Sequence, residues 1–413
     1  MARIYPFQPY RYTSAAGPLQ NLVTQPYDKI SPAAQARYLA QSPYNLVRVI
    51  LGERKTDDNE TDNVYTRAAD YLNDWIASGI LAQDAEPGVY PYFQEFTVPD
   101  SGERLVRKGF IALGAVEDYS ANIVHRHEQT LTGPKKDRLE LLRHTRAHFG
   151  QIFMLYPDPA GEVDTLLAEA AQGAPLLDTL DGDGARHRVW AITNPERTEE
   201  IQELMAPKKL LIADGHHRYE TALAYRNENP GDPAAEYVMM TFVNMYSPGL
   251  KILATHRVLR DMENFTENLG VFQKTWDTAW TPTKYESLDA LKRVFSIRKP
   301  ESIRFGLAAP EGFALLERPR QPGELDVPVL HREILGNLLG IGEEAVREEK
   351  YIHYVRGIDA AVAELQHGAQ NVFLLEPTPI EDMARIAFSG GVMPQKSTDF
   401  YPKLLSGVTI YKL

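Results

Sequence analysis

One short segment of the chain places an aspartate, a glycine, two histidines and an arginine directly after an apolar run. The five residues are Asp214, Gly215, His216, His217 and Arg218. The pattern predicts a strand that turns sharply into a helix, and Gly215 allows that turn. The N–H groups and the dipole at a helix start attract anions, and the histidines and the arginine add hydrogen-bond donors and positive charge there. We therefore expect phosphate chemistry at this turn.

Asp214 is the acidic group of this segment and has three uses open to it. It can cap the helix, accept a proton or bind Mg²⁺. A plain strand–helix turn with an aspartate cap would explain Asp214 and Gly215, but not the two histidines and the arginine beside them. The pattern therefore favours Asp214 as a candidate catalytic residue or metal ligand, with residues 215–218 as candidate phosphate-binding residues.

A second charged segment covers residues 125–138 and reads HRHEQTLTGPKKDR. More than half of it is ionisable, and its Gly-Pro pair is typical of an exposed turn. As a mobile lid, it would bring a substrate-binding set and the candidate catalytic Glu128 to the site. That substrate-binding set is His127, Lys135, Asp137 and Arg138. A solvated surface loop that leads into a helix over residues 139–148 would explain the same charges.

A third segment, residues 390–403, reads GGVMPQKSTDFYPK and begins like a P-loop. Gln395 stands where the last glycine of a P-loop belongs, and the segment follows a predicted helix instead of a strand, so a true P-loop is excluded. A glycine turn with cationic and hydroxyl side chains remains, which suits a polyphosphate. These side chains are Lys396, Ser397, Thr398 and Lys403. We expect this segment and residues 215–218 to face one pocket, although aromatic packing of a C-terminal segment would explain it too.

Histidines supply two weaker signals. His256 and Arg257 end a predicted strand, which is a good position for side chains that face a substrate. His144 and His148 have the spacing of a metal-binding pair on a helix, but the glutamate of the HExxH motif is missing, which favours surface histidines. Neither a GxSxG elbow nor a GxGxxG turn after a strand occurs, so a hydrolase of that type and a Rossmann dehydrogenase have no support.

The elements that must position these residues alternate between strands and helices. Expected helices cover 63–78, 164–171, 216–225, 285–294 and 358–366, and a further helix opens with a capping box at 378–381 and closes at 390–391. Expected strands cover 90–98, 105–116, 152–156, 188–193, 210–213, 237–243, 250–255, 303–309, 313–316, 352–355 and 371–375. This order predicts an α/β (α+β) fold with mixed sheets flanked by helices.

The length of 413 residues suggests more than one domain. Possible boundaries at residues 157–161 and 282–284 give three regions. The first, 1–157, is an α/β region with the lid-like loop 125–138; the second, 158–281, carries the strand–loop–helix at 214–218; the third, 282–413, is an α/β region with the MPQKST loop.

The composition restricts the class of protein. The net charge is −12 and the pI about 5.5, which disfavours nucleic acids and anionic membranes as partners. The chain has no cysteine, which excludes a thiolate enzyme and a cysteine-ligated metal site. The most apolar segments are far too short to span a membrane, and the first residues do not form a signal peptide. We expect a cytoplasmic protein, with no sequence signal for its oligomeric state.

Several motifs, taken together, resemble the family called DUF1015. They are QPYD at 25–28, SPYN at 42–45, HEQTLTGPKKDR, ADGHHRYETA, the stretch from PGL at 248–250 to His256 and Arg257, Leu330-His331, and MPQKSTDFYPK. The DGHHR segment also resembles the nucleotide-binding loop of the ParB/sulfiredoxin-like superfamily, which includes free-serine kinases. That resemblance implies a ParB/sulfiredoxin-like nucleotide-binding core, here with an additional lobe, and nucleotide phosphates bound at residues 214–218.

These observations favour a kinase that uses ATP or ADP with Mg²⁺ to phosphorylate a small hydroxyl metabolite, with free L-serine as the preferred acceptor. Residues 215–218, Lys396 and Lys403 would hold phosphates, and Asp214 or Glu128 would take the hydroxyl proton or bind Mg²⁺. Lys135, Arg138 and Arg257 would hold the substrate carboxylate or a phosphate. Two alternatives stay open: a non-enzymatic nucleotide-sensing regulator of ParB-like type, and a metal-dependent hydrolase that uses His125, His127, His216 or His217.

Overall fold

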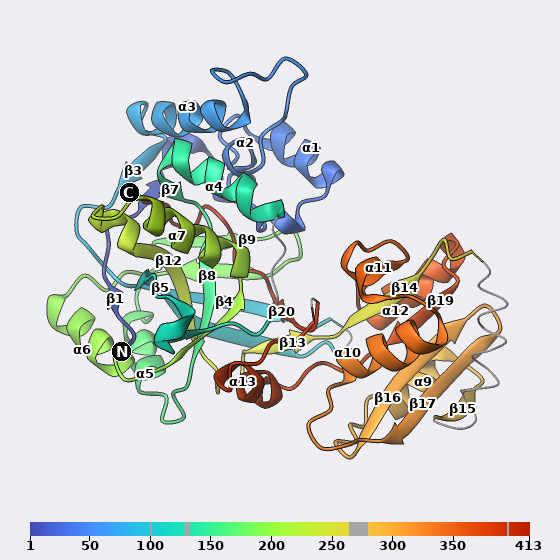
Figure 1. Ribbon diagram of the computed structural model, residues 1–413. Helices are drawn as coiled ribbons and strands as arrows, with labels where there is room; N and C mark the ends of the chain where they lie inside the picture. Colours follow the sequence, from blue (N-terminus) through green and yellow to red (C-terminus); the bar gives the residue numbers. More distant parts are fainter. Residues whose placement is uncertain (100, 129–132, 264–279, 395) are drawn as a thin grey trace. The chain divides into compact units, whose positions relative to one another are not determined.

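The computed structural model describes residues 1–99, 101–128, 133–263, 280–394 and 396–413, and the chain forms two compact units (Figure 1). Unit 1 comprises Met1–Val98, Glu103–Lys251 and Pro402–Leu413, and unit 2 comprises Pro99–Gly102 and Ile252–Tyr401. The chain therefore leaves unit 1, builds unit 2 and returns to unit 1 for its last residues. The three regions expected from the sequence stay a prediction.

Within its described residues, unit 1 is built on a nine-stranded mixed sheet. The strand order is β6 (Val124–His125), β11 (Leu210–Asp214), β8 (Ile152–Tyr156), β12 (Tyr237–Asn244), β5 (Arg104–Ala115), β4 (Tyr90–Thr97), β10 (Arg186–Val189) and β9 (Leu177–Leu180), with β1 (Ile4–Tyr5) on β5. The pairs β11–β6 and β12–β8 are parallel, and the others are antiparallel. The predicted hairpin at 90–116 is confirmed as β4 and β5.

Two groups of helices accompany this sheet. One face packs its apolar side chains against α5 (Glu162–Ala170), α6 (Pro195–Met205) and α7 (His216–Glu228). A second apolar cluster joins α2 (Val47–Ile50), α3 (Val64–Ala77) and α4 (Gly133–Thr145). The predicted helix at 63–78 is confirmed: Asn63 caps α3 by accepting from the backbone N–H of Tyr65 and Thr66. The remaining elements of unit 1 are α1 (Pro32–Gln41) and the strand pairs β2 (Tyr10–Tyr12) with β3 (Leu81–Gln83) and β7 (Ala147–His148) with β21 (Tyr411–Lys412).

Unit 2 contains, in its described part, a six-stranded antiparallel sheet. The strand order is β15 (Thr281–Tyr285), β17 (Gly312–Pro319), β16 (Ser302–Ala309), β19 (Asn371–Leu374), β14 (Thr255–Leu259) and β18 (Ile352–Arg356). The helices are α9 (Leu288–Phe295), α10 (Asp326–Val329) continuing as a π-helix over Leu330–Leu338, α11 (Glu343–Arg347), α12 (Ile358–Ala363) and α13 (Ile380–Phe388), and β13 (Lys251–Leu253) pairs with β20 (Asp399–Tyr401). The mixed α/β class expected from the sequence is confirmed.

Three local predictions need correction. Residues 133–138 belong to helix α4 and not to a loop, and residues 129–132 of the predicted lid lie outside the described residues. Helix α13 has Pro379 before its first residue and no side-chain cap, because the hydroxyl of Thr378 donates to the carbonyl of Ser397 (2.8 Å). Helix α4 ends at Thr145, so His144 and His148 do not share a helix face.

Candidate functional site

The turn between β11 and α7 has the backbone that the sequence predicts. Gly215 precedes the helix with φ +92°, a conformation that side chains strongly disfavour, and no side chain caps the first turn. A Cβ atom on Gly215 would lie 2.9 Å from Nη2 of Arg218, whose guanidinium folds back over the turn. Gly215 is therefore required both for the backbone angle and for the space that Arg218 occupies.

Two cations converge on the carboxylate of Asp214. Oδ2 lies 2.7 Å from Nη2 of Arg218, and Oδ1 lies 3.1 Å from Nζ of Lys403. The side chains of Arg218 and Lys403 are 15% and 9% exposed. Burial on its own would raise the pKa of Asp214, but the charges of Lys403, Arg218 and Lys29 outweigh burial and hold that pKa far below its usual range. Asp214 is therefore a permanent anion and a weak proton acceptor.

The histidines next to this turn are neutral. His127 and His216 are buried, and their rings meet edge to face with centroids 4.8 Å apart. His127 Nδ1 donates to the carbonyl of Ile212 at 2.7 Å. Burial lowers the pKa of His127 and His216, and also that of the half-buried His217. These histidines therefore add hydrogen-bonding groups to the site but not the positive charge that the sequence suggested.

Two buried ring nitrogens of this group lack a hydrogen-bond partner among the described residues. They are Nε2 of His216 and Nδ1 of His217. A buried polar atom without a partner costs free energy, so it is a natural place for a ligand to bind. The carboxylate of Glu128 lies near His127, with Oε1 3.8 Å from Nε2 of that ring.

The charged residues around the start of α4 make ion pairs within unit 1. Lys135 contacts Glu220 of α7, and Arg126 lies 3.5 Å from the same carboxylate. Asp137 accepts from Arg54 (2.7 Å) and from the hydroxyl of Tyr65 (2.8 Å). These pairs fix α4 against α3 and α7.

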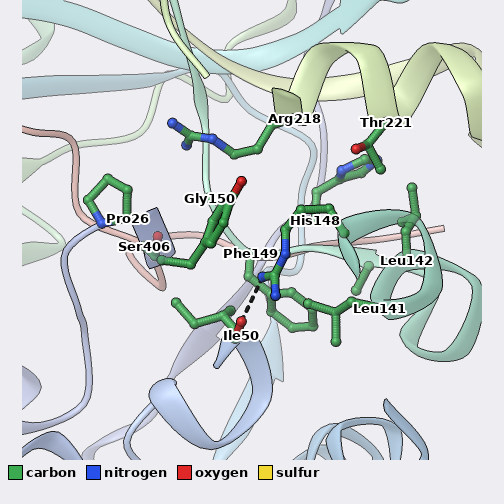
Figure 2. A pocket seen from close by; sticks show the side chains of 13 residues that line it. Pro26, Ile50, Leu141, Leu142, His148, Phe149, Gly150, Arg218, Thr221 and Ser406 are labelled. Atoms are coloured by element: carbon green, nitrogen blue, oxygen red, sulfur yellow. Dashed lines mark hydrogen bonds between the residues drawn. The ribbon is translucent and has the colours of Figure 1, made fainter. Parts of the chain in front are cut away.

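A small pocket opens between α4 and α7 (Figure 2). It has a volume of about 70 Å³. Its lining residues are Pro26, Tyr27, Ile50, Arg138, Leu141, Leu142, Ala147, His148, Phe149, Gly150, Arg218, Thr221 and Ser406. Of the predicted site residues, the structure brings Arg138 and Arg218 together here.

The sequence reasoning missed the residues that hold Lys403 in place. Arg107, on β5, is 1% exposed and donates to Gln94 Oε1 (2.9 Å) and to the carbonyl of Pro402 (2.6 Å). Gln94 Nε2 donates to the carbonyl of Lys403 at 2.9 Å. Burial lowers the pKa of Arg107 to about 9. Arg107 stands in a strand that also contains Arg104 and Lys108, so residue type alone did not single it out.

The remaining predicted residues belong to unit 2. Arg257 is buried and donates to the carbonyl of Lys396 at 3.1 Å, while the hydroxyl of Ser397 donates to the carbonyl of Pro394 at 2.7 Å. His256 is buried and accepts from the backbone N–H of Leu375 at 3.2 Å. Thr398 is half-buried in the same segment. The structure thus brings Lys396, Ser397 and Arg257 together in unit 2, and it brings Lys403 to Asp214 in unit 1.

Metal ligands are sparse around this site. Across the described ranges, no group of three or more histidine or carboxylate side chains could hold a metal ion. Asp214 already contacts Arg218 with one oxygen and Lys403 with the other. No helix in the described part of the chain is long and apolar enough to cross a membrane.

The similarity of this chain to curated proteins and to solved structures is low. No curated protein matches the sequence. Among solved structures, a mutant free serine kinase in complex with ADP aligns with a TM-score of 0.37 at 12% identity, over 68% of this chain and 84% of that chain. A conserved hypothetical protein from Pyrococcus furiosus aligns with a TM-score of 0.37 at 13% identity, over 71% of this chain and 92% of that chain. SbnI with a C-terminal truncation from Staphylococcus aureus aligns with a TM-score of 0.36 at 10% identity, over 72% of this chain and 85% of that chain.

At such similarities the solved structures decide nothing about activity. The family comparison covers much more of the sequence. The family model described as protein of unknown function (DUF1015) matches residues 4–335, so the chain belongs to the DUF1015 family.

Proposed function

We propose that this protein is a nucleotide-dependent kinase that phosphorylates a small hydroxyl metabolite, with free L-serine as the preferred acceptor. The observation that carries the proposal is the convergence of Lys403 and Arg218 on Asp214 at the start of α7. Two nearly buried cations beside an uncapped helix start form an anion site, because the dipole and the N–H groups add to their charge. In this arrangement Asp214 holds the two cations where they can bind phosphate oxygens.

Phosphoryl transfer needs positioned cations and a group that takes the hydroxyl proton, which agrees with this site. Lys403 and Arg218 bind the phosphates of the nucleotide, and the neutral imidazoles of His216 and His217 supply further hydrogen bonds. Glu128 is the better candidate for the base, because Asp214 stays ionised between two cations and is a weak proton acceptor. Asp214 then acts as the residue that positions Lys403 and Arg218.

ATP or ADP is the proposed phosphate donor. Mg²⁺ would arrive bound to the phosphates, since the ion commonly needs only one or two protein carboxylates besides them. Its chemistry is to neutralise phosphate charge, and Asp214 is the carboxylate nearest to the proposed phosphate site. The resemblance of the DGHHR segment to free-serine kinases supports L-serine as the acceptor. The binding roles that the sequence predicts for Lys396 and Arg257, in unit 2, stay predictions.

A two-part experiment tests the proposal. Calorimetric titrations with ATP, ADP, CTP and pyrophosphate, each with and without Mg²⁺ and L-serine, measure binding, and phosphorus NMR measures formation of phosphoserine. We expect ATP or ADP to bind and L-serine to be phosphorylated. Lys403→Met should lower nucleotide affinity at least tenfold, while Lys412→Met in the same C-terminal segment should leave it unchanged.

Two results would overturn this proposal. If no combination of nucleotide and acceptor gives turnover while a nucleotide binds, a non-enzymatic nucleotide-sensing regulator becomes the better account. If Lys403→Met and Lys412→Met bind nucleotide equally well, the phosphate site at Asp214 is wrong.

A further inference from the structure

We propose that the pocket between α4 and α7 binds the carboxylate group of a small acid, held between Arg138 and Arg218. The inference rests on the proposed function and deepens it, because it names where an amino-acid acceptor would be recognised. The pocket volume of about 70 Å³ admits a few water molecules or a carboxylate head group, and is far below the volume that a nucleoside needs.

The two guanidinium groups have hydrogen-bonding capacity left for a ligand. The side chain of Arg138 is 10% exposed and that of Arg218 is 15% exposed. Arg138 donates to Asp137 and to the carbonyl of Ile50, and Arg218 donates to Asp214 and to the carbonyl of Gln151. A guanidinium has five N–H donors. These bonds use three donors of Arg138 and two of Arg218, so each guanidinium can donate further hydrogen bonds to an oxyanion.

The charge balance of the pocket disfavours a ligand with two negative charges, because two carboxylates already balance the two arginines. Each arginine already faces one carboxylate, Arg138 that of Asp137 and Arg218 that of Asp214. His148 adds no charge, because burial lowers its pKa to about 4. Burial also raises the pKa of Tyr27 despite both arginines, so its hydroxyl is neutral. A carboxylate therefore suits the pocket better than a phosphate dianion.

The walls of the pocket restrict the ligand to a small one. Leu141 and Leu142 of α4 and the ring of Phe149 form apolar walls (Figure 2). Gly150 allows close packing, because a Cβ atom there would lie 3.0 Å from the hydroxyl oxygen of Ser406 and 3.2 Å from Nη1 of Arg218. The ring of Tyr27 stacks below the guanidinium of Arg138 at 4.2 Å and holds it flat. A planar carboxylate can then lie against a planar, fixed donor group.

The structure distinguishes three residues, Lys135, Arg138 and Arg257, to which the sequence gave the same role of holding a carboxylate or a phosphate. Lys135 is engaged by the carboxylate of Glu220. Arg257 donates to backbone carbonyls in unit 2. Arg138 lines the small pocket and Lys135 and Arg257 do not, so Arg138 is the residue that we favour for binding a carboxylate there.

Titration calorimetry on the full chain tests the inference without relying on turnover. L-serine and L-alanine carry the carboxylate, ethanolamine is serine without it, and inorganic phosphate represents the other source of an oxyanion. We expect L-serine and L-alanine to bind and ethanolamine not to bind. Arg138→Met should weaken amino-acid binding at least tenfold, while Arg143→Met, a 41% exposed arginine of the same helix, should have no effect.

Arg138→Lys serves as the second variant, because it keeps the charge and most of the packing but loses the fork of donors. Arg138→Lys should also weaken L-serine binding, and it replaces Arg138→Met as the test if that variant fails to fold. Ethanolamine binding as tightly as L-serine, or an unchanged affinity in both Arg138 variants, would overturn the inference. Binding of phosphate alone, weakened by the Arg138 variants, would overturn the assignment to a carboxylate.

The two proposals fail in different ways. Binding of L-serine that depends on Arg138, without turnover, leaves the carboxylate pocket standing and removes the kinase. Turnover with an unchanged KM for L-serine in Arg138→Met leaves the kinase standing and removes the pocket.

Discussion

The Nζ atom of Lys403 lies 3.1 Å from Oδ1 of Asp214, although 189 positions separate the two residues in the chain. Lys403 belongs to the C-terminal segment of unit 1, and Asp214 ends strand β11. The contact makes the C-terminal segment part of the candidate site, and it explains why Asp214 stays ionised. Three of the five predictions below follow from this contact and from the residues around it.

Asp214→Asn should abolish turnover while the fold stays intact. The amide keeps one acceptor oxygen but loses the negative charge that holds Lys403 and Arg218 together. We expect a loss of about 10² or more in kcat, because misplaced cations no longer hold the phosphates in the reacting geometry. Steady-state assays and a urea unfolding curve measure the two effects separately.

The pH profile distinguishes Asp214 from Glu128. The pKa of Asp214 is far below its usual range, so its titration lies outside any working pH. Asp214→Asn should therefore lower the whole kcat profile without changing its shape, while Glu128→Gln, which removes the proposed base, should abolish turnover at every pH tested. An Asp214→Asn enzyme with nearly full activity would show that the roles given to these two carboxylates are wrong.

Gln94→Glu should weaken nucleotide binding through Lys403. Glutamate can still accept from Arg107, but it replaces the N–H donor that now reaches the carbonyl of Lys403. Losing one buried hydrogen bond costs about 1–3 kcal/mol of stability, and the misplaced lysine should raise the KM for nucleotide more than it lowers kcat. The matched control is Gln83→Glu, since Gln83 makes a similar bond to the carbonyl of Gln8 at the surface. Equal KM values in the two variants would contradict a positioning role for Gln94.

Gly249→Ala should destabilise unit 1 strongly. A Cβ atom on Gly249 would lie 2.0 Å from the carbonyl oxygen of Val106 and 2.6 Å from Cα of Arg107, both backbone atoms. Backbone cannot give way as a side chain can, so we expect a cost of about 3 kcal/mol in the free energy of unfolding. Gly173→Ala, where no atom lies within 4 Å of the added Cβ, should change stability far less. Urea denaturation of both variants checks this, and similar midpoints would refute the close approach.

His256 should make stability depend on pH below neutrality. Burial, with a smaller contribution from Arg257, lowers the pKa of His256 to about 3. The unfolded chain takes up a proton near pH 6.5 while the folded chain does not, so stability is full above pH 6.5 and falls as the pH drops towards 3. The slope is about 1.4 kcal/mol per pH unit, which amounts to about 2 kcal/mol between pH 7 and pH 5.

His256→Asn tests this dependence, because asparagine does not titrate and its oxygen can still accept from the N–H of Leu375. The variant should lose less unfolding free energy than the parent chain between pH 7 and pH 5. Parallel curves of stability against pH for the two proteins would contradict the prediction.

Much of the fold could be predicted from local patterns. The helical spacing of apolar residues in α3 and the alternation of apolar and polar residues in β4 and β5 are each complete within one element. They can therefore be recognised from the sequence of that element alone. The start of α4 was missed because its first residues include Gly133 and Pro134, which usually mark a turn, although proline is also favoured in the first turn of a helix. The capping box predicted at 378–381 does not form, because the helix starts after Pro379 and the hydroxyl of Thr378 bonds to Ser397, 19 positions away.

The candidate site was predictable only in part for the same reason. Residue type and spacing pointed to Asp214 and Arg218, which belong to one turn. Nothing local shows that Arg107 and Gln94 support Lys403, because these contacts bring together strands and a segment about 300 positions away. Nor does spacing show that the histidines are buried and neutral, since burial depends on the packed unit.

The discontinuity of unit 1 affects how the protein is made. Residues 402–413 complete this unit, and a ribosome releases them only after all of unit 2. Until then the nascent chain lacks Lys403 and Ser406, so neither the ion pair at Asp214 nor the full wall of the small pocket can form. A product that terminates before residue 402 would carry every residue of the DGHHR turn but not the cation that Lys403 places at Asp214.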